Sequence, residues 1–144
     1  MRVIATIRSR RAMLAGLFSA SAGLVLLRFY DPASSGLFPP CPLHYFTGLY
    51  CPGCGSLRAL HQLLLGNWHT AWAMNPLTCV LLPFLIYGLA SEVWLWVRGR
   101  ALPQIFIPGA CIYGLCAVIV LFGILRNLPV YPFDLLAPGA MLRL

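Results

Sequence analysis

The sequence has few charged residues and no lysine. Only 9% of its 144 residues are charged, three of them are acidic, and all ten basic residues are arginine, which gives a formal net charge of +7. Soluble domains carry roughly a quarter of charged residues. Because 60% of the residues are hydrophobic, a soluble domain of this length has no interior large enough to hide them. A soluble enzyme, a disordered tail and a coiled coil are therefore excluded, and an all-α integral membrane protein is expected.

The sequence also lacks the patterns of several common activities. Its three acids, Asp31, Glu92 and Asp134, are too few and too scattered for paired-carboxylate catalysis. It has no phosphate-binding glycine loop and no Gly-x-Ser-x-Gly nucleophile elbow. Its arginines flank apolar stretches instead of forming one basic patch, so no nucleic-acid partner is expected. The expected partner is the lipid bilayer, and a homo-oligomer or a membrane protein partner stays open.

Three apolar runs have about the length that a bilayer requires. They cover residues 12–30, 76–97 and 105–125. At 1.5 Å per residue the second and third runs rise about 33 and 32 Å, against roughly 30 Å for the hydrocarbon core. The first run has an apolar core of about 24 Å, from Ala12 to Leu27, which Arg28 extends by snorkelling. We therefore expect a single membrane domain, residues 1–144, with three transmembrane helices.

The arginines predict the orientation of these spans. Four arginines precede the first run and two follow the second, which places them on the cytoplasmic side if positive charge stays inside. The N-terminus is then inside, and the loop after the first run and the C-terminus are outside. An alternative for the first run is an export signal, because Arg10-Arg11 precede it and residues 20–22 resemble a cleavage site. The apolar run continues to Leu27, which favours an uncleaved helix.

Residues 31–75 connect the first two runs and contain three of the six cysteines. Within them, Ser56–Leu65 has the period of a short amphipathic helix, because leucines at 57, 60 and 64 share one face. Ser56 is expected to cap this helix. The helix either lies in the membrane interface or packs on the bundle as an ordinary loop helix.

The three cysteines of this loop predict a metal site. Cys-Pro-Gly-Cys-Gly at 51–55 forms a turn that aims two sulfur atoms at one point. A third cysteine lies ten residues upstream and is followed, three residues later, by a histidine. Three sulfur atoms and one imidazole match tetrahedral zinc. The predicted zinc ligands are Cys41, His44, Cys51 and Cys54. His61 or His69 is the alternative fourth ligand if His44 does not fill that position.

Two other states of these cysteines remain open. A structural disulfide of Cys41 with Cys51 or Cys54 suits an oxidising outer compartment. A redox-active pair of Cys51 and Cys54, with thiol pKa values lowered by a helix N-terminus and by Arg58, would make the chain a membrane thiol–disulfide oxidoreductase. The alternating strands and helices of thioredoxin are absent. The expected function is therefore a non-enzymatic accessory or structural module whose loop is held by zinc or a disulfide.

The loop and the segment after it resemble a known family. Cys-Pro at 41–42, Thr-Gly-Leu-Tyr-Cys-Pro-Gly-Cys-Gly-Ser at 47–56, Arg-Ala at 58–59 and Asn-Pro-Leu at 75–77 are similar to the bacterial Domain of Unknown Function 2752 family, as is Arg-Asn-Leu-Pro at 126–129. The resemblance implies a small protein of the bacterial cytoplasmic membrane and no particular activity. It agrees with one site in which Arg58 and Asn75 support the cysteines. In this site we expect Arg58 to offset thiolate charge and Asn75 to bind the loop or cap the second span.

Overall fold

The chain is all helical in a computed structural model, which describes residues 2–99, 103 and 108–143 and, within these, the side chains of residues 13–141. The described residues contain no strand, which agrees with the predicted all-α class. In chain order the elements are α1 Arg2–Phe29, α2 Pro42–Thr47, α3 Ser56–Leu64, α4 Trp68–Met74, α5 Pro76–Arg98, α6 Gly109–Leu125 and the 3-10 turns η1 Phe133–Leu136 and η2 Ala140–Arg143.

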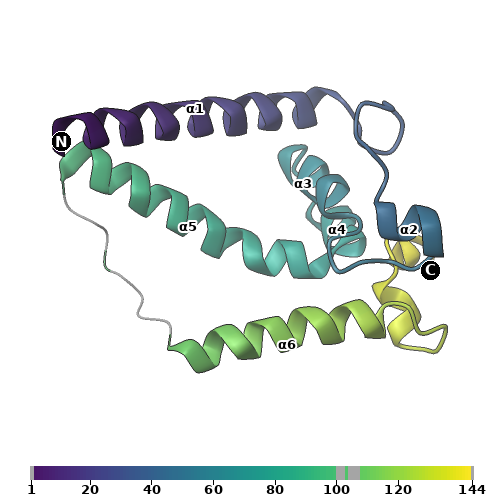
Figure 1. The fold of residues 1–144 in the computed structure, drawn as a ribbon. Helices are drawn as coiled ribbons and strands as arrows, with labels where there is room; N and C mark the ends of the chain where they lie inside the picture. The colour runs from purple at the N-terminus through teal and green to yellow at the C-terminus, as the bar shows by residue number, and fades with distance from the viewer. Residues whose placement is uncertain (1, 100–102, 104–107, 144) are drawn as a thin grey trace.

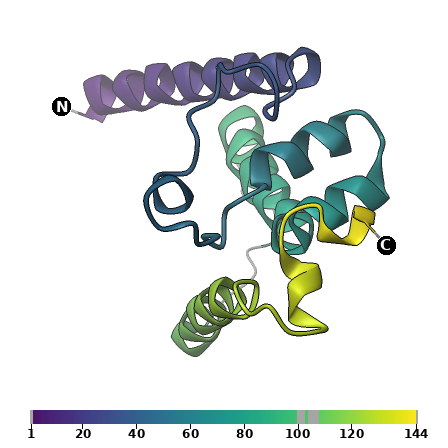
Figure 2. The ribbon, with the colours of Figure 1, turned by 90° about the vertical axis from the view of Figure 1, so that its right-hand side faces the viewer.

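Three long helices extend from one side of a compact head. We define the head as residues 30–75 and 126–141, which contain α2, α3, α4 and the C-terminal turns. The C-terminal end of α1, the N-terminal end of α5 and the C-terminal end of α6 all meet the head (Figure 1). α1 packs on α3, and α5 packs on α3 and α4. In Figure 2, α1 and α6 lie on opposite sides of the head.

The long helices agree with the predicted apolar runs to different degrees. α5 begins at Pro76, as predicted, has 23 residues, and ends where Gly99 adopts φ 68°. Among the described residues it is the one helix both long and apolar enough to cross a membrane. α1 begins earlier than predicted, at Arg2. Its apolar part with described side chains is Met13–Phe29, which has 17 residues. α6 also has 17 residues, and the predicted start of its run at 105 lies outside the described residues.

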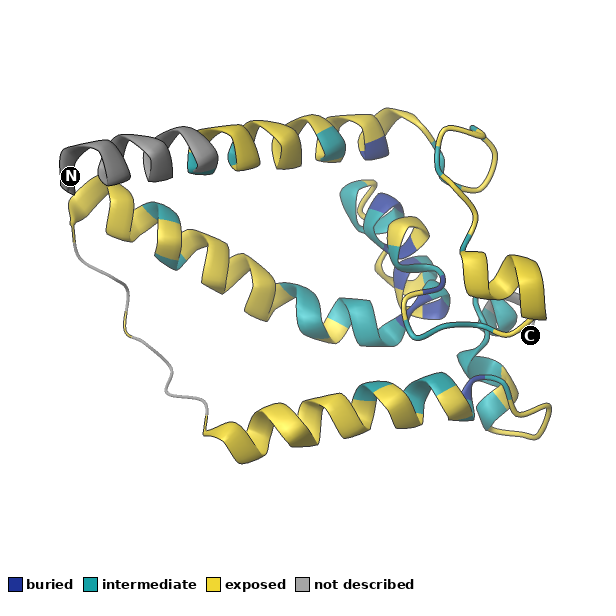
Figure 3. Cartoon of the chain, in the orientation of Figure 1, coloured by how far each residue is buried: buried dark blue, intermediate teal, exposed yellow. Residues whose placement is uncertain are grey.

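Burial in this chain is reversed relative to a soluble protein. Large apolar side chains such as Phe18 and Phe84 are exposed along the long helices, and α5 and α6 contain no buried residue (Figure 3). The largest fully buried side chains are instead polar: Arg126 and Asn75. Both lie in the head. The buried apolar residues of the described chain are Leu27, Cys54, Ala59, Ala71 and Ala73, so its interior combines a small apolar core with hydrogen-bonded polar side chains.

The head contains more helix than the sequence indicated. α3 forms close to the predicted range, but its N-cap is Gly55, and the Ser56 hydroxyl pairs with Thr78 Oγ1 at 2.7 Å. The prediction that Ser56 caps this helix is therefore wrong. α3 packs against α4, α1 and α5. α2 and α4 were not predicted, because six or seven residues are too few to show a helical period.

Candidate metal centre

Three cysteine sulfur atoms gather at the edge of the head. Cys51 Sγ lies 3.4 Å from both Cys41 Sγ and Cys54 Sγ, and all three sulfur atoms lie within 4.8 Å of one another. We call this group the thiol cluster. Two sulfur atoms on one tetrahedral zinc ion at about 2.3 Å are about 3.8 Å apart. All three cysteines are free, since 3.4 Å is well beyond the length of an S–S bond, about 2.05 Å.

The local backbone brings these sulfur atoms together. Cys54 follows a tight turn in which its N–H donates to Cys51 O at 3.0 Å. Gly55 then continues into α3 with φ 84°, and a Cβ at this position would lie 2.6 Å from Met74 O. Gly55 therefore has to be glycine for two reasons, its left-handed backbone and the close approach of α4.

The three thiols of the cluster differ in acidity. The backbone N–H of His44 and the neighbouring Cys51 thiol lower the pKa of Cys41 from 9.0 to about 7. Burial, together with the adjacent Cys51, raises the pKa of Cys54 to about 12. Cys54 is buried and Cys41 and Cys51 are half-buried. The cluster therefore has one thiol that ionises near neutrality and one that requires a cation to become a thiolate.

Asn75 connects the cysteine turn to α5. Its Nδ2 donates to the carbonyl oxygens of Pro52 and Cys54 at 3.0 and 3.1 Å, and lies 3.1 Å from Ser56 Oγ. Its Oδ1 accepts from Thr78 N at 3.2 Å, which caps α5. Asn75 is fully buried. Both contacts considered from the sequence, loop binding and capping, are thus present at once.

Arg126 contributes a buried cation to the same turn. Its Nη1 donates to Cys51 O and Pro52 O at 3.1 and 3.2 Å, and its Nη2 donates to Cys54 O at 3.1 Å. The side chain is 1% exposed. Burial lowers the pKa of Arg126, while negative charge on the nearby cysteines opposes this. All three acids lie in the described residues, and none of them forms an ion pair with Arg126 there.

The C-terminal end of α6 is fastened to the cysteine turn at two further points. Asn127 donates from Nδ2 to Tyr50 O at 2.8 Å, and its Oδ1 accepts from Tyr50 N at 2.7 Å. Gly123 lies against Pro52, because a Cβ on Gly123 would be 2.8 Å from Pro52 Cγ. In the sequence, Arg126 and Asn127 directly follow the third apolar run, and no contact of theirs with the cysteine turn was predicted. The signal that was present is the similarity of residues 126–129 to the resembled family.

The other predicted site residues lie outside the thiol cluster. His44 stacks on Tyr50 with ring centroids 4.6 Å apart, and its Nδ1 is 3.1 Å from Gly48 O. Arg58 is exposed and makes no hydrogen bond or ion pair to a described residue. Among the described histidine, cysteine and acidic side chains, one close group of three or more is found, and its members are Cys41, Cys51 and Cys54. The cation that the structure places at the cluster is therefore Arg126, not Arg58.

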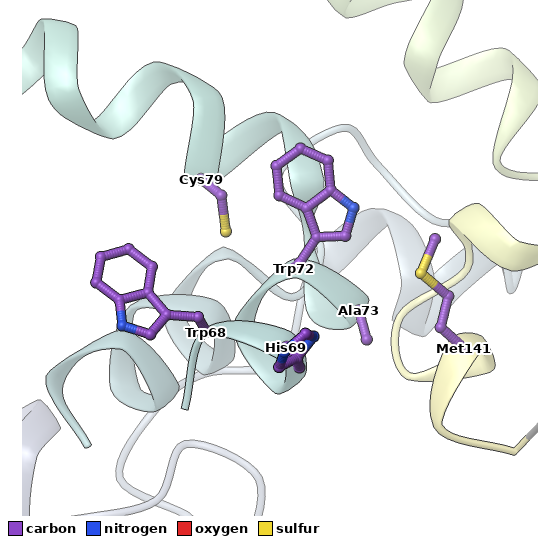
Figure 4. Close-up of a pocket in the computed structure, with 6 residues that line it drawn as sticks. All are labelled: Trp68, His69, Trp72, Ala73, Cys79 and Met141. Atoms are coloured by element: carbon purple, nitrogen blue, oxygen red, sulfur yellow. The ribbon is translucent and has the colours of Figure 1, made fainter. Parts of the chain in front are cut away.

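The head also contains an open cavity of about 350 Å³. Its lining residues come from α4, α5 and η2 (Figure 4), and they are Trp68, His69, Trp72, Ala73, Cys79 and Met141. The cavity is mainly apolar and contains no acid or arginine side chain among these residues. His69 lines this cavity and is not part of the thiol cluster.

The fold and site define a small helical protein in which a cluster of three cysteines sits at the base of long apolar helices. Residues 41–89 match the family described as "Protein of unknown function (DUF2752)", which supports the family assignment that the cysteine loop predicted. The matched segment contains the thiol cluster and Asn75 but not Arg126. No curated protein and no solved structure matches the chain.

Proposed function

We propose that this chain is a small multi-pass protein of the bacterial cytoplasmic membrane, in which α1, α5 and α6 cross the bilayer. The reversed burial supports this proposal, because a helix with large apolar side chains exposed on all sides is stable in lipid and not in water. α5, with 23 residues, rises about 35 Å and can span the hydrocarbon core. The shorter apolar parts of α1 and α6 require local thinning of the bilayer or snorkelling of flanking arginines.

The arrangement of helix ends supports the predicted orientation. In a chain that crosses a membrane three times, successive spans run in opposite directions. The side that holds the first loop therefore meets the C-terminal end of the first span, the N-terminal end of the second and the C-terminal end of the third. The head meets the long helices by these ends (Figure 1). Together with the arginines before α1, this favours an N-terminus inside and the thiol cluster and C-terminus outside.

Single cysteines in a cysteine-free chain test this orientation. Phe46→Cys in the head and Val97→Cys at the far end of α5 both replace exposed side chains, 82% and 62% exposed. In intact cells, we expect a membrane-impermeant maleimide to label Phe46→Cys, and Val97→Cys only after lysis. The reverse pattern would reject the orientation, and labelling of both in intact cells would reject the three-span arrangement.

We further propose that the thiol cluster binds one zinc ion that holds the head together, and that the chain is an accessory module rather than an enzyme. The observation that carries this proposal is a buried arginine without a carboxylate beside three converging thiols. A divalent ion with three thiolates has a formal charge of −1, which the Arg126 guanidinium balances. Without such an anionic group, burial of this cation is costly.

One form of the redox alternative, in which a disulfide passes between Cys54 and Cys41 through Cys51, fits the same geometry less well. With two sulfur–sulfur distances of 3.4 Å and the third no more than 4.8 Å, the angle at Cys51 Sγ is about 90° or less. Transfer of a disulfide from one partner of Cys51 to the other needs the attacking and leaving sulfur atoms nearly in line. Three sulfur atoms at the corners of a compact triangle match one face of a tetrahedral coordination site better.

Metal analysis of the protein purified in mild detergent, without chelator or reductant, tests the zinc proposal. We expect about one zinc per chain, and alkylation of Cys41, Cys51 and Cys54 only after a chelator is added. A variant with the other three cysteines replaced by serine is the matched control and should keep its zinc, whereas Cys51→Ser should lose it. No metal, together with a mass about two hydrogens below that of the free thiols, would reject zinc in favour of a disulfide.

A further inference from the structure

The chain has few groups from which a fourth metal ligand can come. All its histidine, cysteine, aspartate and glutamate residues lie in the described part of the chain. Of their ligand atoms, only the three sulfur atoms of the thiol cluster form a close group. The remaining cysteines and Glu92 lie in α5 and α6, and the other two acids lie in the turn after α1 and in η1. The three histidines therefore remain to be considered.

Each histidine has contacts elsewhere. His61 is buried, and its Nδ1 is hydrogen-bonded to Leu27 O at the end of α1. His69 lines the apolar cavity (Figure 4). His44 is nearest in sequence, but the Tyr50 ring and Gly48 O hold its imidazole outside the cluster. Moving His44 onto the ion would break both the ring stack and the hydrogen bond, which are worth about 1 kcal/mol each.

We propose that an ion bound by the thiol cluster keeps a fourth coordination position that this chain does not fill. A small neutral donor occupies and exchanges at this position: water in the isolated protein, and imidazole when it is supplied. This inference rests on the proposed metal centre. Structural zinc sites are usually closed by four protein ligands, whereas three protein ligands and one open position are typical of sites that exchange a ligand.

The charge of the site favours a neutral donor. One divalent ion, three thiolates and the Arg126 guanidinium sum to zero formal charge. A neutral fourth ligand preserves this balance, whereas an anionic ligand would add an uncompensated charge beside a buried turn. Access is available, because Cys41 and Cys51 are half-buried and Gly53 is exposed. Gly53 places no side chain beside Cys51, where a Cβ would lie 3.9 Å from Sγ.

Cobalt(II), which substitutes for zinc and whose visible spectrum reports its ligands, provides the test on the full chain in detergent. His44→Phe keeps an aromatic ring to stack on Tyr50 and removes both nitrogen atoms, and His69→Phe is the matched control. We expect all three proteins to bind cobalt equally tightly with the same spectrum. We also expect added imidazole to shift that spectrum, in a saturable way, equally in all three.

Two results would overturn the open position while leaving the metal centre in place. The first is a cobalt affinity reduced by roughly 10-fold or more in His44→Phe but not in His69→Phe, since losses of 10–100-fold are typical even for groups that only support a ligand. The second is a wild-type spectrum that imidazole does not change, and this measurement does not depend on the folding of any variant. Failure of the wild-type protein to bind cobalt or zinc would instead overturn the metal centre itself.

Discussion

The contact between α6 and the cysteine turn predicts opposite effects of one substitution at two glycines of the same helix. An alanine Cβ at Gly123 would lie 2.8 and 3.2 Å from Pro52 Cγ and Cδ, closer than carbon atoms approach without strain. At Gly114 a Cβ would meet nothing within 4 Å. Neither glycine has a positive φ, so the two substitutions differ mainly in this contact.

The expected magnitudes follow from this difference. Overpacking of this kind costs about 1–3 kcal/mol, and replacing glycine within a helix returns about 0.5–1 kcal/mol. We therefore expect Gly123→Ala to destabilise the docking of α6 on the head by about 1–2 kcal/mol, because α6 has to move away from Pro52 and take Arg126 with it. Gly114→Ala should leave this docking unchanged.

The rate at which buried Cys54 is alkylated measures this docking in metal-free protein. Cys54 is 8% exposed, so the reagent reaches it when the turn opens locally. A loss of 1–2 kcal/mol increases the open population, and with it the rate, by about 5–30-fold. We expect this acceleration in Gly123→Ala alone, followed by peptide mass spectrometry. Equal rates in the two variants would refute the argument that α6 is packed on the turn at Gly123.

Three further predictions concern the turn itself. Asn75→Ala should lower the free energy of unfolding by about 2–3 kcal/mol, since it removes a helix cap and the hydrogen bonds to the turn; a denaturant titration that finds less than about 0.5 kcal/mol would contradict this. Gly55→Ala should abolish metal retention, because its Cβ meets Met74 O, whereas Gly48→Ala, with φ 73° and open space, should lose only about 1–2 kcal/mol of stability. In metal-free protein, iodoacetamide should modify Cys41 with a half-maximal rate near pH 7, because its pKa is lowered to about 7, while Cys54, whose pKa is raised to about 12, stays slow up to pH 9; identical pH profiles would show that the two thiols are not distinguished.

The position of the cysteines in the chain was informative, but their geometry was not accessible from spacing. The Cys-Pro-Gly-Cys turn is local, so the proximity of Cys51 and Cys54 could be predicted. Cys41 reaches the same point through α2, a short helix that no period indicated. His44 was predicted as a ligand from its spacing of three residues, yet the first turn of α2 carries it to the Tyr50 ring. Whether His44 binds an ion stays a prediction for the cobalt experiment.

The role of the arginines shows a similar division. Arg58 lies four residues after Cys54, and this proximity suggested a charge partner for the thiolates. In the structure α3 carries Arg58 to an exposed position, and Arg126, which is 72 residues from Cys54, donates to the turn instead. No local pattern encodes a contact over that distance, because it depends on how α6 returns to the head.

The sequence by itself determined the all-helical class, the extent of α5, the family resemblance of the cysteine loop and the cysteines that carry the candidate site. Apolar content, a proline in the first turn and turn-forming glycines are local properties, and they act through the backbone of their own segment. Only the tertiary structure decided which polar side chains surround the cysteines. Asn75, Arg126 and Asn127 converge on one turn because its buried carbonyl oxygens and N–H groups need hydrogen-bond partners, and those partners come from the ends of α5 and α6.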